Sequence, residues 1–490
     1  MRLSKAERGT ALDLAVINAT ILTLGHDRRV IAGGSVAVAD GRITAVGDAA
    51  SVHPEGAGQV IDAKGKVLMP GFVNAHTHAI HNLLRGGLSD DRVLYDWLLN
   101  VLYPGVLAYT AEDARIAARL FCLEAIRSGI TTVVDNADFG KMDYLADATI
   151  DVYREMGLRA IYARMFSDHT PPELIPYLEA IEAKEPEVHH DPSPTEDTAA
   201  ALDSISRLIE RHHGAADGRI QVWPSPGIAV FTTREGLLGA KDLARRNGTM
   251  LTIHVAESRF DAQQNGVSGV EYLASIGFLG PDVLAGHCVQ LDHNDIRMLR
   301  VTDTRVANNV VSNMFLASGI APVAEMVLAG VTVGIGTDDC NCNTSVSMLS
   351  DMKFAALAQK VKYGNSAAIT AEKVVEMATI DGARAVGLGD EIGSIEVGKK
   401  ADFILLDLNQ PQTVPAFSIP SVLVYQTYGN EVDTVVVDGN VLMEGRRLTH
   451  MSADEESELL TAAQSAAEAV VERAGMARIR DRGWKSFVGV

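Results

Sequence analysis

Residues 70–78 read PGFVNAHTH, and the interpretation of the whole chain starts from this stretch. The apolar run 67–69 leads into it and predicts a strand. His76 and His78 would point to the same face of that strand, because side chains alternate along it. Neutral imidazole is a common ligand for zinc and other first-row metals. Histidine is also an ordinary core or surface residue, so the pair indicates a metal site only if further ligands join it.

The net charge of the chain and the short length of its apolar runs exclude several classes of partner. The 490 residues include 43 Lys and Arg against 63 Asp and Glu, a formal charge of −20. Nucleic acid and anionic membrane surfaces both require a basic face, so neither is an expected partner. No apolar run approaches the roughly 18 residues of a membrane span, and the first residues lack a signal-peptide pattern. We therefore expect a cytoplasmic protein.

The cysteines are consistent with a reducing compartment. The sequence contains four of them: Cys122, Cys288, Cys340 and Cys342. Four cysteines in so long a chain do not make a disulfide framework. Cys340 and Cys342 form a C-x-C pair, but two thiolates need further ligands to complete a tetrahedral metal site.

Apolar segments that alternate with helical stretches define the central part of the chain. The strand candidates are 72–76, 130–135, 158–166, 220–224, 250–255, 283–289, 305–312 and 331–336. Near-continuous apolar strands between helices indicate a parallel sheet that is buried on both faces. These units across residues 70–388 predict an α/β fold of the (β/α)8 TIM barrel type.

Short strands with glycine turns occupy both ends of the chain, for example at 14–24, 35–39, 42–46, 391–397, 403–407 and 434–437. We expect 1–69 and 389–450 to combine into a small β-sandwich beside the barrel, and 451–490 to form a helical tail with a helix at 454–473. The polar stretch 171–198 predicts an exposed insertion. Histidines in polar surroundings are expected to be solvated: His189, His190, His212 and His213.

Further metal-type ligands follow later predicted strands. They are His254 at the end of the fifth strand, His287 at the end of the sixth and Asp338 at the end of the eighth. The carboxyl ends of barrel strands carry the active site, whereas the opposite face serves stability. Together with His76 and His78, these side chains would meet at one end of the barrel. The sequence therefore predicts a metal site there.

Longer motifs resemble one family. The segments HTH, HVAES, GHC and GTDD are similar to the deaminase-type, single-metal branch of the amidohydrolase superfamily. The segments LLRGG, YDWLLNVLYPG, EMATIDGAR and EIGSIEVGKKAD extend the resemblance over nearly the whole chain. They resemble the s-triazine hydrolases, the group that includes melamine deaminase and atrazine chlorohydrolase.

The resemblance implies one divalent ion, Zn²⁺ or Fe²⁺, as the cofactor. Its implied ligands are His76, His78, His254, His287 and Asp338. Such a ligand set can keep a position for water and lower the pKa of that water towards neutrality. The fourth predicted strand carries no lysine, which favours one metal over two. Asp338 would take the proton of the water, Glu257 would protonate a ring nitrogen, and His287 completes the implied catalytic group.

The implied reaction replaces an amino group on an N-heteroaromatic ring, such as melamine or another s-triazine, with hydroxyl. Within this group, Asp at 339 and Cys at 342 accompany the deaminase, whereas Asn and Ser accompany the chlorohydrolase. A carboxylate accepts hydrogen bonds from an amine leaving group, which chloride cannot offer. Leu94 and Leu102 also resemble the deaminase side, although Cys340 replaces a glycine of the group.

The same resemblance points to residues that line the substrate pocket. His81, Leu94 and Trp97 match pocket positions, and an aromatic ring there can stack on a flat substrate. Asn313 and Asp138 end the seventh and second predicted strands. We expect both to touch the substrate or to orient the metal ligands.

Other functions remain open at this point. The same site suits a deaminase of a purine, pterin or adenosine-type compound, and chloride could replace the amine as leaving group. A non-catalytic scaffold relative would have lost ligands, whereas all five are present. The expected partners are a small N-heterocyclic substrate and water, and by resemblance a further copy of the chain in a homo-oligomer.

Overall fold

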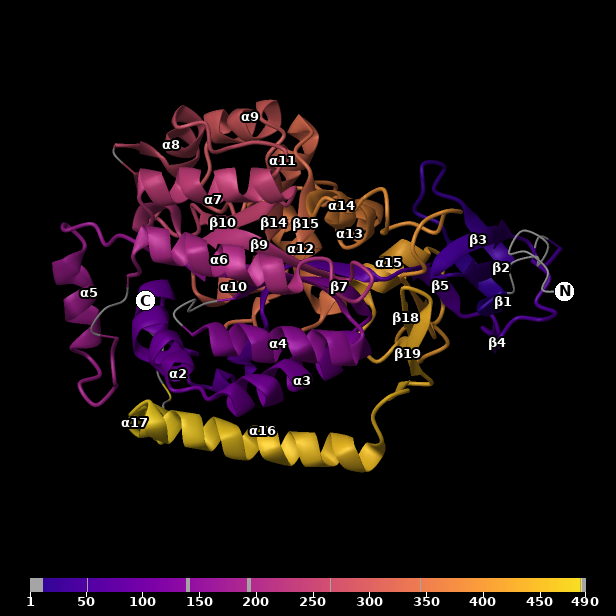
Figure 1. The fold of residues 1–490 in the computed structure, drawn as a ribbon. Helices are drawn as coiled ribbons and strands as arrows, with labels where there is room; N and C mark the ends of the chain where they lie inside the picture. The colour runs from indigo at the N-terminus through magenta and orange to yellow at the C-terminus, as the bar shows by residue number, and fades with distance from the viewer. Residues whose placement is uncertain are drawn as a thin grey trace, which may run out of the picture.

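The computed structural model describes residues 12–484 and 486, apart from 51, 138–141, 192–194, 265 and 344. Within them the protein is a mixed α/β structure. The larger part consists of parallel strands and helices, and a mixed sheet from both chain ends lies beside it, on the right in Figure 1. Asp138, one of the predicted site residues, lies outside the described residues.

Two parallel sheets form the centre of the larger part. One contains β16 (Asp338–Asp339), β6 (Phe72–His78), β7 (Ile130–Ala137), β8 (Arg159–Phe166) and β9 (Ile220–Pro226), in that order. The other contains β10 (Leu251–Val255), β13 (Val283–His287), β14 (Arg305–Asn308) and β15 (Val333–Ile335). Every residue of β6, β7 and β8 is buried, as expected for parallel strands covered on both faces.

The edges of the two sheets approach each other on both sides. After β9, Ile228 forms a parallel bridge with His254, and the backbone N–H of His254 donates to the Gly227 carbonyl at 3.0 Å. On the other side, the chain runs directly from β15 into β16, which pairs with β6. The N–H of Thr337 donates to the side chain of Asn74 across this junction at 3.0 Å.

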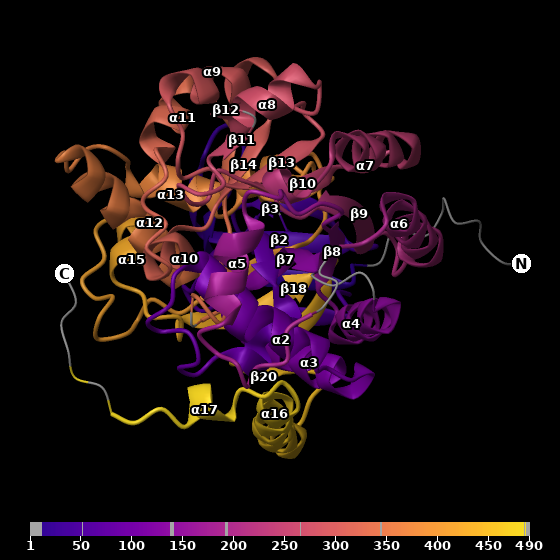
Figure 2. The same cartoon turned by 90° about the vertical axis from the view of Figure 1, so that its left-hand side faces the viewer.

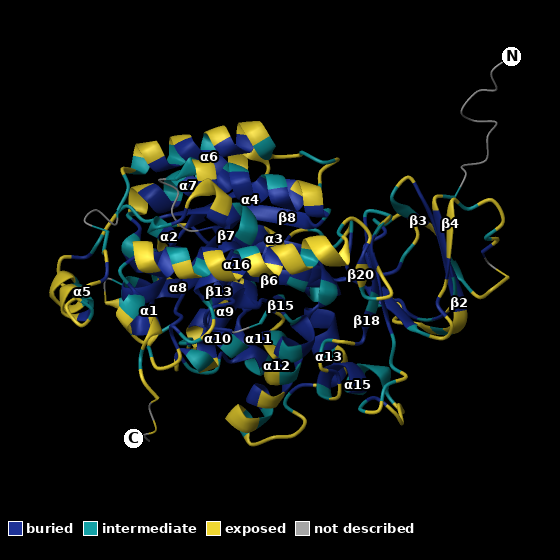
Figure 3. Cartoon of the chain, turned by 90° about the horizontal axis from the view of Figure 1, so that it is seen from below, coloured by how far each residue is buried: buried dark blue, intermediate teal, exposed yellow. Residues whose placement is uncertain are grey.

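Helices cover the outside of these strands, as Figure 2 shows end-on. They include α3 (Ala111–Arg127), α4 (Asp143–Met156), α6 (Thr198–His212), α7 (Arg234–Asn247), α8 (Gly269–Ser275), α9 (His293–Val301), α11 (Val323–Ala329), α12 (Met348–Tyr363), α13 (Ala371–Met377) and α14 (Ile380–Ala385). Their inner faces are buried and their outer faces exposed (Figure 3). Helix α3 begins at a capping box between Thr110 and Asp113, and α4 ends at Gly157 in the left-handed conformation.

The chain ends share one nine-stranded sheet. Its N-terminal strands are β1 (Leu14–Leu22), β2 (Val30–Ala39), β3 (Arg42–Gly47), β4 (Gln59–Asp62) and β5 (Val67–Pro70). Its C-terminal strands are β17 (Phe403–Leu406), β18 (Val432–Val437), β19 (Asn440–Glu444) and β20 (Arg447–Leu448). The two groups join where β17 pairs antiparallel with β5, directly before the strand that carries the first two histidines.

The helix expected at 454–473 is present as α16 (Ala453–Arg473). It begins at a capping box between Ser452 and Glu455 and runs along α3 (Figure 1). Arg473 fixes its far end by donating to the carbonyl of Ala108 at 2.9 Å. No helix among the described residues combines the length and apolar character required to cross a bilayer.

Two sequence-based predictions of strands are wrong. The strand predicted at 305–312 ends at Asn308, and helix α10 (Val310–Phe315) follows it. Val310 and Val311 are therefore helical despite their strand preference, and Val310 is buried in the core. The segment 391–397 forms turns instead of a strand, since Gly393 has a φ of 86° and Ile392 bonds back to the Leu388 carbonyl.

Candidate active site

The five predicted metal ligands come together at one end of the parallel strands. His76 and His78 lie on β6, His254 on β10, His287 at the end of β13 and Asp338 on β16. Nitrogen and oxygen atoms of these residues lie within 4.8 Å of one another in two overlapping groups. The groups are His76, His78 and His254, and His76, His287 and Asp338. Neither cysteine of the C-x-C pair belongs to them.

Asp338 lies between the imidazoles. Its Oδ1 is 3.3 Å from Nε2 of His76 and 3.3 Å from Nε2 of His78. On the opposite side of the cluster, Nε2 of His254 lies 3.5 Å from Nε2 of His78. All of these side chains are buried. A carboxylate and several imidazoles at these separations form a compact nitrogen and oxygen donor set.

Hydrogen bonds behind the cluster fix the tautomer of two of the imidazoles. His254 donates through Nδ1 to the Gly227 carbonyl at 2.9 Å. His287 donates through Nδ1 to Oδ1 of Asn313 at 2.9 Å. A carbonyl and an amide oxygen can only accept, so each ring carries its proton on Nδ1 and presents an unprotonated Nε2. This is the tautomer that binds a metal through Nε2.

The backbone is unusual at two ligands that lie on short strands, His287 on β13 and Asp338 on β16. His287 and Asp338 have φ angles of 69° and 59°, in the left-handed region that residues with side chains rarely adopt. Gly336, two residues before Asp338, permits the close approach of β6. A Cβ atom at Gly336 would lie 2.7 Å from the Cβ of His76. Strain of this kind is maintained where the surrounding structure requires it, and it is concentrated at functional sites.

Glu257 lies beside the cluster without joining it. Its Oε2 is 3.6 Å from Nε2 of His287, and its backbone N–H donates to Asp261 at 2.9 Å. Burial raises the pKa of Glu257 well above its usual value, and the negative charges of Asp338 and Asp261 raise it further. Burial and these charges therefore favour the protonated form of this carboxyl group, which is the form that can donate a proton.

Asp338 is shifted in the opposite direction. Burial opposes its ionisation, but His287, His76 and His78 outweigh that effect and hold the pKa of Asp338 well below its usual value. Burial also lowers the pKa of His76 to about 4 and that of His254 well below its usual value, so both imidazoles are neutral. One carboxyl group, Glu257, thus favours its protonated form beside another, Asp338, that is ionised. This is the arrangement required for acid and base chemistry on one substrate.

These residues fit a divalent metal ion. The buried Nε2 of His76 lies 3.3 Å from Oδ1 of Asp338 but makes no hydrogen bond of good geometry in the described part of the chain, although burying such an atom is costly. Neutral imidazoles with Nε2 available, together with an ionised carboxylate, form the donor set that zinc and ferrous iron prefer. The cluster is therefore a candidate centre for one such ion.

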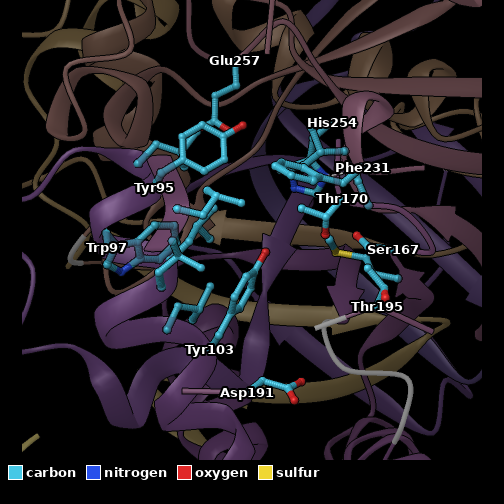
Figure 4. Close-up of a pocket in the computed structure, with 18 of the residues that line it drawn as sticks. Tyr95, Trp97, Tyr103, Ser167, Thr170, Asp191, Thr195, Phe231, His254 and Glu257 are labelled. Carbon is cyan, nitrogen blue, oxygen red and sulfur yellow. Dashed lines mark hydrogen bonds between the residues drawn. The ribbon is translucent and has the colours of Figure 1, made fainter. Parts of the chain in front are cut away.

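A cavity of about 520 Å³ opens from the cluster. His78, His254, His287, Glu257 and Asp338 line its inner end. In Figure 4, Glu257 and His254 lie at one end and Asp191 at the other, with aromatic side chains between them. Aromatic rings on the wall suit a flat heterocycle, because ring faces and edges pack well on one another.

Other predicted pocket residues are divided between the cavity and the layer behind it. Leu94, Trp97 and Leu102 line the cavity. Leu94 and Trp97 are the first and last residues of α1 (Leu94–Trp97). Leu102 ends the π-helical turn (Leu98–Leu102) that joins α1 to α2 (Tyr103–Leu107). His81, Asn313, Asp339 and Cys342 do not line it.

The residues behind the cavity contact one another or the metal ligands. Asp339 pairs with Nδ1 of His81, whose ring stacks on His78 with centroids 5.1 Å apart. Sγ of Cys342 lies 3.1 Å from the hydroxyl of Ser312. Asn313 is on helix α10, not at a strand end as predicted, and it bonds to His287 from there. These residues orient the site from behind.

The sequence did not identify the outer wall of the cavity. This wall comes from the insertion between β8 and β9, including residues of helix α5 (Ile175–Glu182), which lies near the centre of the view in Figure 2. The described cavity-lining residues of this segment are Ser167, His169, Thr170, Ile175, Leu178, Glu179, Glu182, Asp191, Thr195 and Glu196. The polar composition predicted exposure correctly for most of the insertion but gave no sign that it faces the site. Tyr95 was also missed, because it lies in the largely apolar stretch 94–103, which resembles ordinary core.

Comparison with known proteins agrees with this geometry. The model of the amidohydrolase family matches residues 67–442. The 5′-deoxyadenosine deaminase of Methanosarcina acetivorans is 39% identical over 466 residues, 94% of this chain and 99% of that protein. The S-triazine hydrolase of Gordonia rubripertincta is 44% identical over 330 residues, 67% of this chain and 69% of that protein.

A solved structure gives the same picture. An adenosine deaminase from Xanthomonas campestris, crystallised with bound zinc, superposes with a TM-score of 0.83 at 26% identity and covers 94% of this chain and 99% of that one. The fold and the cluster thus define a hydrolase of carbon–nitrogen bonds. The chain belongs to the amidohydrolase family.

Proposed function

We propose that the protein hydrolytically deaminates the 6-aminopurine ring of a nucleoside. The observation that carries this proposal is the cavity, because about 520 Å³ is more than a single triazine ring fills and suits a purine joined to a sugar. Similarity to 5′-deoxyadenosine deaminases along 94% of the chain supports the same substrate class. This substrate replaces the s-triazine that the sequence motifs favoured.

A divalent ion bound by the histidines and Asp338 would supply water that is activated for attack at neutral pH. The side chains of the protein then accept and donate the protons. Asp338, ionised and directed at the cluster, accepts a proton from the water. Glu257, protonated and 3.6 Å from His287, donates a proton to the ring nitrogen beside the carbon that is attacked. Hydroxide adds to that carbon, and Asp338 passes the proton it accepted to the amino group, which leaves as ammonia when its bond to the carbon breaks. The proton of the new hydroxyl group returns to Glu257, so the ring is released in its keto form.

A substrate panel tests the proposal. The protein is loaded with Zn²⁺ or Fe²⁺ and offered 5′-deoxyadenosine, adenosine, guanine, melamine and atrazine, while ammonia and chloride are measured. We expect ammonia from the adenine nucleosides in equal amount to the hypoxanthine nucleoside formed. Ammonia from melamine alone, or chloride from atrazine alone, would contradict the nucleoside assignment.

Deamination of an s-triazine is the second candidate. It is favoured by the 44% identity to an S-triazine hydrolase, although this similarity spans only 67% of the chain. Asp339 and Cys342 lie behind the cavity, so their effect on the leaving group would act through His81 and the loop after β16. The doubly substituted D339N/C342S protein tests this candidate, since it should release less ammonia from melamine and gain chloride release from atrazine.

We further propose that the two parallel sheets close into one (β/α)8 barrel over 70–388. The bridge between Ile228 and His254 and the direct passage from β15 to β16 support closure at both junctions. The sheet formed by 1–69 and 389–450 would then be the β-sandwich, and 451–490 the helical tail. Proteolysis would test these boundaries, with first cuts expected near them and the barrel fragment left intact.

A further inference from the structure

A single buried carboxylate shapes the turn that carries Glu257. Asp261, which is 4% exposed, accepts hydrogen bonds from the backbone N–H groups of Glu257 at 2.9 Å and Ser258 at 2.7 Å. The hydroxyl of Ser258 also donates to Asp261. These three donors favour the ionised form of Asp261, although burial raises its pKa. One side chain thus holds two successive peptide groups of the turn.

The residue before Glu257 fixes the other end of this turn. Ala256 has a φ of 48°, in the left-handed region, so the chain changes direction directly before Glu257. The Ala256 carbonyl accepts hydrogen bonds from the backbone N–H groups of Val289 at 3.0 Å and Gln290 at 2.9 Å, which lie after the neighbouring strand β13. The backbone of Glu257 is therefore constrained on both sides, by the loop after β13 and by Asp261.

Phe260 connects the same turn to the cavity wall. The centroid of its ring lies 4.5 Å from that of Tyr95 and 5.0 Å from that of Tyr177. Its backbone N–H donates to the Ser258 hydroxyl at 3.2 Å. Asp261 itself does not line the cavity, whereas Glu257 does. Any effect of Asp261 on a substrate in the cavity must therefore act through the turn 256–261.

We propose that Asp261 is a positioning residue that directs the carboxyl group of Glu257 at the ring nitrogen of the substrate. This inference rests on the deaminase function proposed above. A proton donor is effective only at the right distance and direction, and a displacement of about 1 Å can reduce a rate by about 100-fold. Without Asp261, the N–H groups of Glu257 and Ser258 would lose their acceptor, and the turn would no longer hold Glu257 in one place.

A double-mutant cycle on the metal-loaded enzyme tests the proposal. Asp261→Asn keeps the size of the side chain but replaces one acceptor oxygen with an NH2 group. We expect kcat for 5′-deoxyadenosine to fall by about 10- to 100-fold in D261N, with KM within about threefold and the metal content unchanged. In the Glu257→Gln background, D261N should lower the remaining kcat by less than about twofold, because no proton donor is left to position.

Asp295 provides the matched control. It is 3% exposed, and it likewise accepts a backbone N–H, from Asp292 at 3.0 Å, and a serine hydroxyl, from Ser268. These bonds hold the start of α9 instead of the turn 256–261. D295N should therefore reduce stability to a similar degree as D261N, while kcat stays within about twofold of the unmodified enzyme.

Hydrogen exchange gives a readout that does not depend on turnover. The amides of Glu257 and Ser258 should exchange faster by on the order of tenfold in D261N than in the unmodified protein or in D295N. Unchanged exchange of these amides overturns the inference alone, as does an equal fall of kcat when D261N is introduced with and without E257Q. Ammonia from melamine and from no nucleoside overturns the nucleoside assignment, and the same cycle run with melamine then tests the inference separately. No ammonia from any compound of the substrate panel overturns both.

Discussion

Nε2 of His287 lies 3.6 Å from Oε2 of Glu257, and the opposite nitrogen of the same ring donates to Asn313 at 2.9 Å. A residue on helix α10 thereby fixes the imidazole of a residue at the end of β13. That imidazole in turn faces Glu257, whose pKa burial raises well above its usual value. The proton donor and the metal cluster thus share one oriented side chain.

Glu257→Gln removes the proton donor and preserves the shape of the side chain. We expect kcat for the deaminated substrate to fall by about 10²- to 10⁴-fold, the usual contribution of general acid catalysis. The bound metal should remain, since Glu257 does not belong to either ligand group. Ammonia release and metal content measure the two effects, and Glu210→Gln on the exposed face of α6 is the control. Loss of the metal in E257Q would show that this residue is a ligand.

Asn313→Leu removes the acceptor that orients His287. We expect kcat to fall by about 10- to 100-fold, as found when partners of metal-bound or catalytic histidines are removed. Asn313→Asp keeps an oxygen acceptor and should retain more activity than the leucine variant. Equal losses in both variants would mean that Asn313 acts through packing and not through this hydrogen bond.

A buried ion pair connects the parallel strands to the terminal sheet. Arg159 on β8 donates to both carboxylate oxygens of Asp402 at 2.8 and 3.0 Å, and both residues are buried. Arg159→Met leaves the Asp402 charge buried without its partner and should lower the free energy of unfolding by about 3–5 kcal/mol. Denaturant midpoints measure this change. The exposed pair of Arg245 with Asp242 is the comparison, because Arg245→Met should change stability by less than about 1 kcal/mol.

The stability contribution of Asp351 should depend on pH. This carboxyl group is fully buried beside Asn343, and burial raises its pKa well above the usual value. Its contribution is therefore fully present below the pKa of the unfolded state and is lost as pH rises through the higher pKa of the folded state. Asp351→Asn, which cannot ionise, should gain in melting temperature over the unmodified protein as pH rises from about 4 to about 8. A difference that stays constant or falls with pH would contradict the shift.

The ligands of the candidate site could be predicted because each follows an apolar strand of clear period. His76 and His254 needed only the rule that parallel strands end at one face. The location of Asn313 could not be predicted from the sequence, because its β-branched neighbours resemble a strand and only tertiary packing makes them a helix. Asp339 illustrates a further limit, because sequence places it next to Asp338 while strand alternation turns it away from the cavity towards His81. The wall supplied by α5 depends on how a long insertion folds back, which no local pattern specifies.

The central claim is that the His and Asp cluster binds a metal that the protein requires to release ammonia from an aminopurine nucleoside. The most direct test measures ammonia from 5′-deoxyadenosine before metal removal, after chelation and after resupply of Zn²⁺ or Fe²⁺. The account predicts that chelation abolishes ammonia release and that about one metal ion per chain restores it. Undiminished ammonia release from metal-free protein, or none from folded, metal-loaded protein, would contradict it.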